Sequence, residues 1–136
     1  MKIARYTAIF LTVLFIGTVS IERLPGVLVP TDVPYESLMF GLFEISLLDD
    51  ITHGVSGLLG LFALIAGYHW TVKFLMLVGG YYTLDALFFI IYGFFTGQGI
   101  VDNILLNGPH ILIAIVVYYA LLKSVKRIEL NEKVLP

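Results

Sequence analysis

The sequence predicts an all-α protein, a polytopic four-helix bundle that spans a membrane. Hydrophobic residues make up 59% of the 136-residue chain and charged residues 13%, whereas a soluble domain carries about 45–50% and about 25%. A chain this short cannot enclose so much apolar surface in a core of its own. Several apolar runs also approach the roughly 20 residues that one helix needs to cross a bilayer. We therefore expect the apolar excess to face lipid.

Four segments meet this length requirement, at residues 6–21, 51–68, 74–95 and 104–122. They lack the alternating pattern of a barrel strand, so helices are the expected spanning structure. The first follows Lys2 and Arg5, as the apolar part of a signal peptide would. No Ala-x-Ala-like site follows it, so we expect a retained helix. The chain is thus predicted to be one transmembrane domain, residues 1–136.

The connection between the first two spans, residues 22–50, is predicted to be an outer loop. Prolines and a glycine break its first part into turns and extended backbone, at Pro25, Gly26, Pro30 and Pro34. Residues 35–48 beyond them predict a short helix along the outer interface, because polar and apolar side chains separate onto opposite faces. The polar arc holds Glu36, Ser37, Gly41 and Glu44; the apolar side holds Leu38, Met39, Leu42, Phe43 and Ile45.

Basic residues indicate how the chain is oriented. Seven of the eight precede the first span, lie between the second and third, or follow the fourth, and Arg23 alone falls on the opposite side. Cytoplasmic loops carry an excess of lysine and arginine. We therefore predict that both termini are cytoplasmic, with a tail at residues 123–136, in a bacterial plasma or inner membrane.

Small and polar residues predict how the helices pack. In the second span Ser56, Gly60, Ala63 and Gly67 recur at intervals of four, three and four residues, a spacing that favours close helix contact in lipid. His53 extends this stripe, so we expect it to point into the bundle. The fourth span has a comparable face at Asn103, Asn107, His110, Ala114 and Val117, near a kink expected at Pro109. Helix caps are predicted at Asp49, Asp50 and Asp102.

Asp85 is the charged residue that falls well inside a span, near the middle of residues 74–95. A carboxyl at that depth is costly and marks a functional hypothesis by default. The helical rise of 1.5 Å per residue brings His110 and His53 to neighbouring depths. Such a series can carry protons, bind a cation or ligate a metal. Two structural alternatives stay open: a neutral Asp85 hydrogen-bonded to Tyr81 or Tyr82, and an ion pair with His110 that only stabilises the fold.

Cofactor and enzyme signals are sparse. His53 and His110 are candidate metal or haem ligands. A purely structural hydrogen-bonding role is the alternative, and it is favoured because the sequence has no closely spaced histidine pair. The chain has no cysteine and therefore no thiol chemistry. It also lacks a nucleophile elbow, an HExxH motif, a phosphate-binding glycine loop and a di-iron carboxylate motif. We expect no enzymatic activity. Apart from a metal or haem held by His53 and His110, we also expect no resident cofactor.

Several short motifs resemble a widespread bacterial family of small four-helix membrane proteins, catalogued as a domain of unknown function. They are residues 41–45 (Gly-Leu-Phe-Glu-Ile), 49–60 (Asp-Asp-Ile-Thr-His-Gly-Val-Ser-Gly-Leu-Leu-Gly) and 102–105 (Asp-Asn-Ile-Leu). The family opens its second helix with Asn-x-x-His-x-x-x-Gly and its fourth with Asp-Asn-x-x-His. Here Asp50 replaces the first Asn and Leu106 stands at the second His, with His110 one turn further on. The resemblance implies a four-helix topology and no established activity.

These observations leave three functional hypotheses. The first is a non-enzymatic accessory, scaffold or stress-related membrane component. The second is a small proton- or cation-coupled transporter or channel that uses Asp85 with His53 and His110. The third is a metal- or haem-binding redox subunit. Expected partners are the lipid bilayer and either further copies of the chain or a larger membrane complex. Nucleic acid is excluded, because the net charge is −2 and the chain has no basic patch.

Overall fold

A computed structural model describes residues 2–32, 34, 36–41 and 43–134, with the backbone alone at residues 43, 44 and 125–134. Within these residues, four helices are long and apolar enough to cross a membrane. This confirms the predicted four-helix class. The elements in chain order are α1 (Lys2–Ile21), β1 (Leu28–Pro30), β2 (Glu36–Met39), β3 (Phe43–Ser46), α2 (Leu47–Ala66), α3 (Tyr68–Phe95) and α4 (Ile100–Val134).

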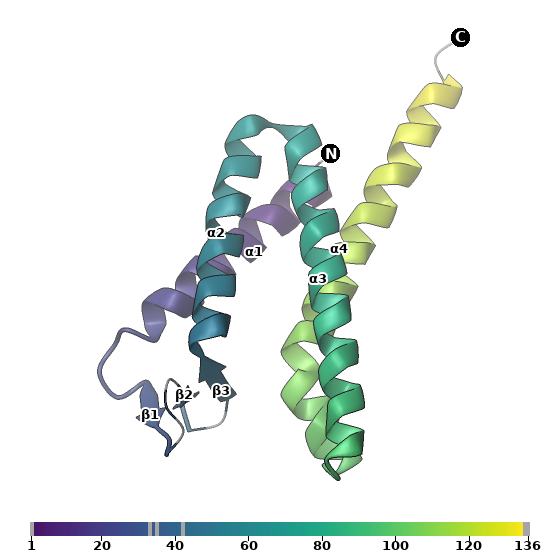
Figure 1. The fold of residues 1–136 in the computed structure, drawn as a ribbon. Coiled ribbons are helices and arrows are strands. Elements are labelled where there is room, and N and C mark those ends of the chain that lie inside the picture. The colour runs from purple at the N-terminus through teal and green to yellow at the C-terminus, as the bar shows by residue number, and fades with distance from the viewer. Residues whose placement is uncertain (1, 33, 35, 42, 135–136) are drawn as a thin grey trace.

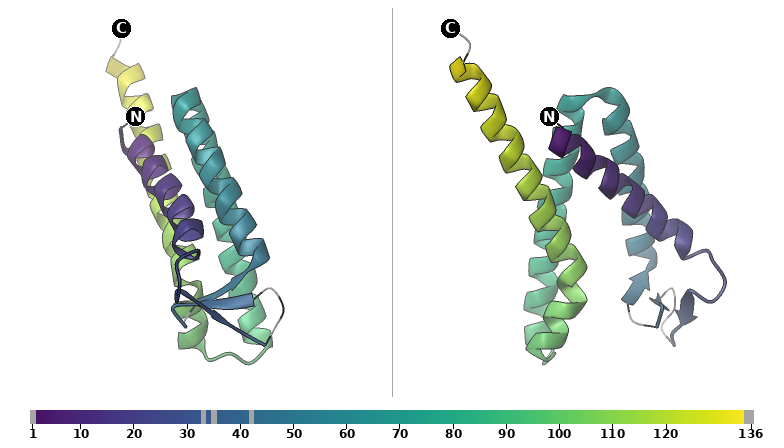
Figure 2. Two further views of the ribbon diagram at one scale, coloured as in Figure 1. Left: turned by 90° about the vertical axis from the view of Figure 1, so that its left-hand side faces the viewer. Right: turned by 180° about the vertical axis from the view of Figure 1, so that it is seen from behind.

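The helices pack as two pairs. The most extensive contacts are those of α1 with α2 and of α3 with α4, and smaller contacts of α2 with α3 and of α1 with α4 join the pairs. Figure 1 shows the three strands and the α3–α4 turn at one end of the molecule, which we call the sheet end. The α2–α3 turn, the N-terminus and the end of α4 lie toward the other, the terminal end, as the rear view in Figure 2 also shows.

A single residue separates α2 from α3. Gly67 has φ 103°, a conformation that favours glycine, and its N–H donates to the Ala63 carbonyl over 3.2 Å. The Thr71 hydroxyl donates to the same carbonyl and to that of Gly67, at 3.3 and 3.1 Å. Because one glycine completes the turn, residues 69–73, which lie between the second and third predicted spans, belong to α3, which begins at Tyr68.

The predicted outer helix over residues 35–48 is wrong for the residues that the structure describes. A three-stranded antiparallel sheet takes its place, with the order β1-β2-β3 and with Leu28 opposite Met39 and Glu36 opposite Ser46. The reason lies in the turn after β2, where Phe40 and Gly41 have φ of 54° and 70°. A right-handed helix cannot contain that conformation, whereas hairpin turns favour it. Tyr35 and Leu42 lie outside the described residues.

Helices α1 and α3 approach α2 closely at its glycines Gly57 and Gly60. A Cβ at Gly60 would overlap the Thr12 side chain of α1 and lie 3.0 Å from Cζ of Phe74 in α3. A Cβ at Gly57 would lie 2.6 Å from Cγ1 of Ile16. The buried residues of α2 are Gly57, Gly60 and Ala63. Ser56, placed in this stripe by the sequence, is half-buried instead, and Gly67 lies in the turn.

The long helix α4 continues beyond its apolar part. Its membrane-length segment is Ile100–Ser124, and it contains Pro109 within the helix. The backbone stays helical to Val134, so most of the predicted tail extends α4 past the other helices, as Figure 1 shows. Opposite it, a Cβ at Gly79 of α3 would lie 2.9 Å from Cγ1 of Val117, so glycine permits close approach there too.

Candidate functional site

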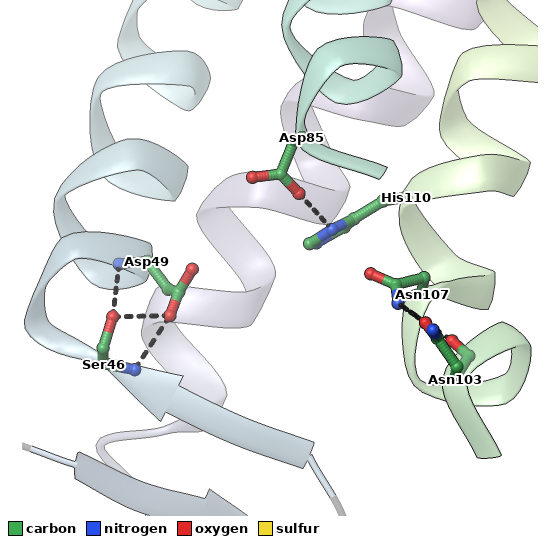
Figure 3. A network of polar contacts seen from close by, with 6 residues as sticks. All are labelled: Ser46, Asp49, Asp85, Asn103, Asn107 and His110. Carbon is green, nitrogen blue, oxygen red and sulfur yellow. Dashed lines mark hydrogen bonds and ion pairs between the residues drawn. The ribbon is translucent and has the colours of Figure 1, made fainter. Parts of the chain in front are cut away.

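Asp85 and His110 meet between α3 and α4. Oδ2 of Asp85 lies 2.5 Å from Nδ1 of His110, and the side chains are 16% and 28% exposed. Figure 3 shows the two side chains pointing toward each other from their helices. The two atoms are as close as those of an ion pair. Their geometry is not that of a hydrogen bond, since neither atom has a hydrogen-bond partner among the described residues. An imidazole and a carboxylate this close can share or exchange a proton.

Four rings, one from each helix, form a stack beside this pair. Phe15 of α1 lies between His53 of α2 and Tyr82 of α3, with ring centroids 5.9 and 5.5 Å apart. Tyr82 in turn lies 5.1 Å from His110 of α4, where the two ring planes are tilted by 60° and not stacked. We call this set the ring stack. Such aromatic contacts contribute about 0.5–1.5 kcal/mol each beyond the burial of surface. The ring stack therefore fixes both histidines relative to Asp85.

A small polar pocket lies at the ring stack. Its free volume is about 10 Å³, close to the space that one water molecule needs. Besides Oδ2 of Asp85 and Nδ1 of His110, two more of its groups are buried polar atoms with no hydrogen-bond partner among the described residues, Nδ1 of His53 and the Tyr82 hydroxyl. The pocket thus brings together all three residues that the sequence placed at neighbouring depths. Its lining is Asp49, Thr52, His53, Tyr81, Tyr82, Asp85 and His110.

The first turns of α2 supply three residues of the pocket lining, Asp49, Thr52 and His53. Ser46 is the N-cap, and it forms a capping box with Asp49. The Ser46 N–H and hydroxyl donate to Oδ2 of Asp49 over 2.9 and 2.6 Å, and the Asp49 N–H donates back to the hydroxyl over 3.3 Å. Figure 3 shows this arrangement at the end of β3. Asp49 is therefore the third residue of the helix rather than its cap, and His53 follows one turn later.

The other predicted cap residues lie in first turns, Asp50 in α2 and Asp102 in α4. Asn103 and Asn107 of α4 form a hydrogen-bond network apart from the pocket. Nδ2 of Asn103 donates to the Ile90 carbonyl of α3 over 2.9 Å, and Nδ2 of Asn107 donates to the carbonyl and Oδ1 of Asn103 over 2.8 and 2.9 Å. Figure 3 shows both nearer the sheet end than His110. Asn103 joins α4 to α3, Asn107 holds the Asn103 side chain in place, and neither residue lines the pocket.

The bundle is mainly apolar between the ring stack and the terminal end, and the buried hydroxyls of Thr12 and Thr71 there donate to backbone carbonyls. The buried core there comes from every membrane-length helix. A polar group that moves from the pocket toward the terminal end has to cross this apolar core, where an unsatisfied polar group costs several kcal/mol. The core residues include Leu11, Leu75, Val78, Ile113 and Val117.

Glu22, just beyond α1, is a second buried carboxyl near the sheet end. It is 5% exposed, and Asp50 lies within hydrogen-bonding reach of it. Burial, followed by the hydrogen bond and charge of Asp50, raises the pKa of Glu22 to about 8. Because two ionised carboxylates cannot donate to each other, one shared proton satisfies both. The sequence analysis did not single out Glu22.

The described residues contain no group of three or more histidine, cysteine, aspartate or glutamate side chains arranged to hold a metal ion. His53 and His110 do line one pocket, so their role as metal or haem ligands stays a prediction. The site needs Phe15 as well, which the sequence analysis did not single out. A signal was present in α1, because Ala4, Ala8, Leu11 and Phe15 recur at helical spacing on one face.

Comparison of the chain with protein-family models, with curated proteins and with solved structures finds no match.

Proposed function

We propose that the protein is a small proton- or cation-coupled transporter of a bacterial plasma membrane, with both termini in the cytoplasm and the sheet end outside. The observation that carries the proposal is the contact of Asp85 with His110, 2.5 Å apart between membrane-length helices. Ionisable residues within membrane helices typically mark ion pathways and proton relays. The nearby His53 supplies a second imidazole on the same pocket.

The shape of the bundle supports a carrier rather than an open channel. Transporters of the alternating-access type keep a binding site open to one side while packed helices close the other. Here the apolar core between the ring stack and the terminal end supplies the closed side. The division into α1–α2 and α3–α4 pairs supplies two bodies that can move relative to each other, with the pocket where they meet.

Proton flux into liposomes tests this proposal. Purified protein is reconstituted with a pH-sensitive dye inside, and the external pH is stepped. We expect flux above that of protein-free liposomes, and we expect Asp85→Asn to abolish it. Asp102→Asn is the matched control, because Asp102 is exposed in the first turn of α4 and does not line the pocket. Equal flux in wild type and Asp85→Asn would contradict the proposal.

An accessory or scaffold role is the second candidate. It is favoured by the buried apolar core that lies between the pocket and the terminal end. In that case Asp85 and His110 mainly hold α3 and α4 together. Co-purification with a stable membrane partner supports this candidate. Transport by the reconstituted chain alone argues against it.

A further inference from the structure

An apolar groove runs between α2 and α3 beside the polar pocket. Its volume is about 260 Å³, near the lower limit of about 300 Å³ for typical small-molecule sites. Ile51, Val55 and Leu59 form one wall, and Phe74 and Leu77 belong to the other. The rim is open, since Ile51 and Leu77 are 54% and 59% exposed. In a bilayer this opening meets hydrocarbon, so a membrane-soluble molecule can enter from the side.

The groove joins the polar pocket. Thr52, Tyr81 and Tyr82 line both. Tyr82 is 1% exposed, and its hydroxyl has no hydrogen-bond partner among the described residues. A buried polar atom of this kind gains a hydrogen bond when a ligand supplies the partner. A ligand that fits both spaces is therefore amphiphilic, with an apolar body in the groove and a small polar head at the pocket.

The charges around the pocket select the head group. Asp49 and Asp85 line it, and no lysine or arginine lines either the pocket or the groove among the described residues. The imidazoles of His53 and His110 are the groups there that can become positive. Asp50 adds a further negative charge near His53. This balance attracts an ammonium head and repels a carboxylate or a phosphate.

We propose that the groove and the polar pocket together bind an amphiphilic amine, with the ammonium beside Asp85 and Asp49 and the apolar body between α2 and α3. This inference rests on the proposed transport function and names its substrate class. The ammonium takes the place of a proton held by Asp85 and His110, so binding releases a proton from the pocket. No covalent step is involved, and charge is balanced by this exchange.

Three probes with the same apolar body test the head-group selection. They are 4-phenylbutylamine, 4-phenylbutan-1-ol and 4-phenylbutanoate, titrated calorimetrically into the full chain in nanodiscs, with empty nanodiscs subtracted. We expect the amine to bind about tenfold or more tightly than the alcohol, as a charge-assisted hydrogen bond allows, and the carboxylate to bind most weakly. Equal affinities for all three would overturn the proposal and show that the groove binds apolar chains without regard to the head group.

Two variants and one control locate the site. Asp85→Asn is expected to remove the amine's advantage over the alcohol, whereas Leu59→Trp fills the groove and weakens both probes. Leu58→Trp is the matched control, because Leu58 is 67% exposed and does not line the groove. Equal amine binding by Leu59→Trp and Leu58→Trp would contradict the proposed location.

Proton release on amine binding can be measured on the wild-type protein, so the result does not depend on whether a variant folds. Amine binding measured in two buffers of different ionisation enthalpy reports the protons released, and we expect release together with weaker binding at lower pH. Amine binding without proton release would contradict the exchange and leave an amine site that is not proton-coupled. Conversely, proton flux that depends on Asp85 without any amine binding would overturn the substrate class while the proposed transport function stands.

Discussion

The contact between Asp85 and His110 defines the site at the scale of single residues. Each side chain retains some exposure, 16% and 28%, so the pair is neither sealed in the core nor freely hydrated. Removing one partner of a partly buried ion pair leaves the other without its counter-charge. Two residues that depend on each other in this way are expected to show energetic coupling.

A double-mutant cycle measures that coupling. We expect Asp85→Asn and His110→Gln each to lower the free energy of unfolding by about 1–3 kcal/mol, and the double variant to lose less than the sum by about 0.5 kcal/mol or more. Denaturant unfolding in mixed micelles provides the values. Strictly additive losses would show that the two side chains do not stabilise each other.

Glu22 predicts a pH dependence of stability. Its pKa is about 8 in the folded protein, against an ordinary value of 4.5 for a glutamate side chain, so near neutral pH the folded state holds a proton that the unfolded state releases. Stability from this group is full below about pH 4.5 and falls as the pH rises toward 8. We expect Glu22→Gln to flatten the decline in melting temperature over that range. Asp32→Asn, at an exposed position, is the control, and an equal slope in both variants would contradict the assignment.

At the scale of elements, the sequence located the helices well and misjudged the loop. Apolar runs long enough to cross a bilayer leave few alternatives for the backbone, so the four predicted spans overlap the four observed helices. The residues of β2 and β3 separate into polar and apolar arcs when drawn as a helix. The left-handed turn at Phe40 and Gly41 overrides that pattern. The spacing of polar and apolar residues does not indicate such a turn.

The candidate site was predictable only in part, for a related reason. The position of Asp85 within a span and the helical rise put it at a depth near His110 and His53. Depth along a helix says nothing of rotation about its axis or of which helices are neighbours. Phe15 and Tyr82 complete the ring stack because α1 lies against both α2 and α3, and the sequence does not specify that neighbourhood.

Close packing of α2 against α1 and α3 predicts opposite effects for two glycines of the same helix. We expect Gly60→Ala to lower the free energy of unfolding by about 1–3 kcal/mol, because the new Cβ meets the rigid side chain of Thr12, whose hydroxyl donates to the Ala8 carbonyl over 2.7 Å. Gly54→Ala is the matched control, since a Cβ there meets nothing within 4 Å. It is expected to leave stability unchanged or to raise it by up to about 1 kcal/mol. Equal losses would contradict this packing.

At the scale of the whole molecule, the account depends on which end of the bundle faces the cytoplasm. The chain has no cysteine, so each introduced cysteine is a unique label. We expect Asp32→Cys and Gln98→Cys, exposed near the sheet end, to react with a membrane-impermeant maleimide added to intact cells. Lys2→Cys and Lys73→Cys, toward the terminal end, are expected to react only after the membrane is opened. The reverse pattern would invert the proposed topology.

The whole bundle also explains why the polar pocket sits where it does. The ring stack takes one side chain from each of the four helices, so any movement of α1 and α2 relative to α3 and α4 changes the surroundings of Asp85. Protonation or ligand binding at one carboxyl can thus bias the arrangement of both helix pairs, which is the coupling that a carrier requires.

Infrared difference spectroscopy of the protein in a lipid bilayer tests the central claim most directly, that Asp85 takes up and releases a proton. The carboxyl stretching bands are followed from about pH 4 to about pH 9, a range that covers carboxyl and imidazole titration. We predict a protonation-dependent carboxyl band that is lost in Asp85→Asn and kept in Asp102→Asn. A set of titrating bands that is identical in wild type and Asp85→Asn would show that Asp85 holds one protonation state throughout, and would contradict the account.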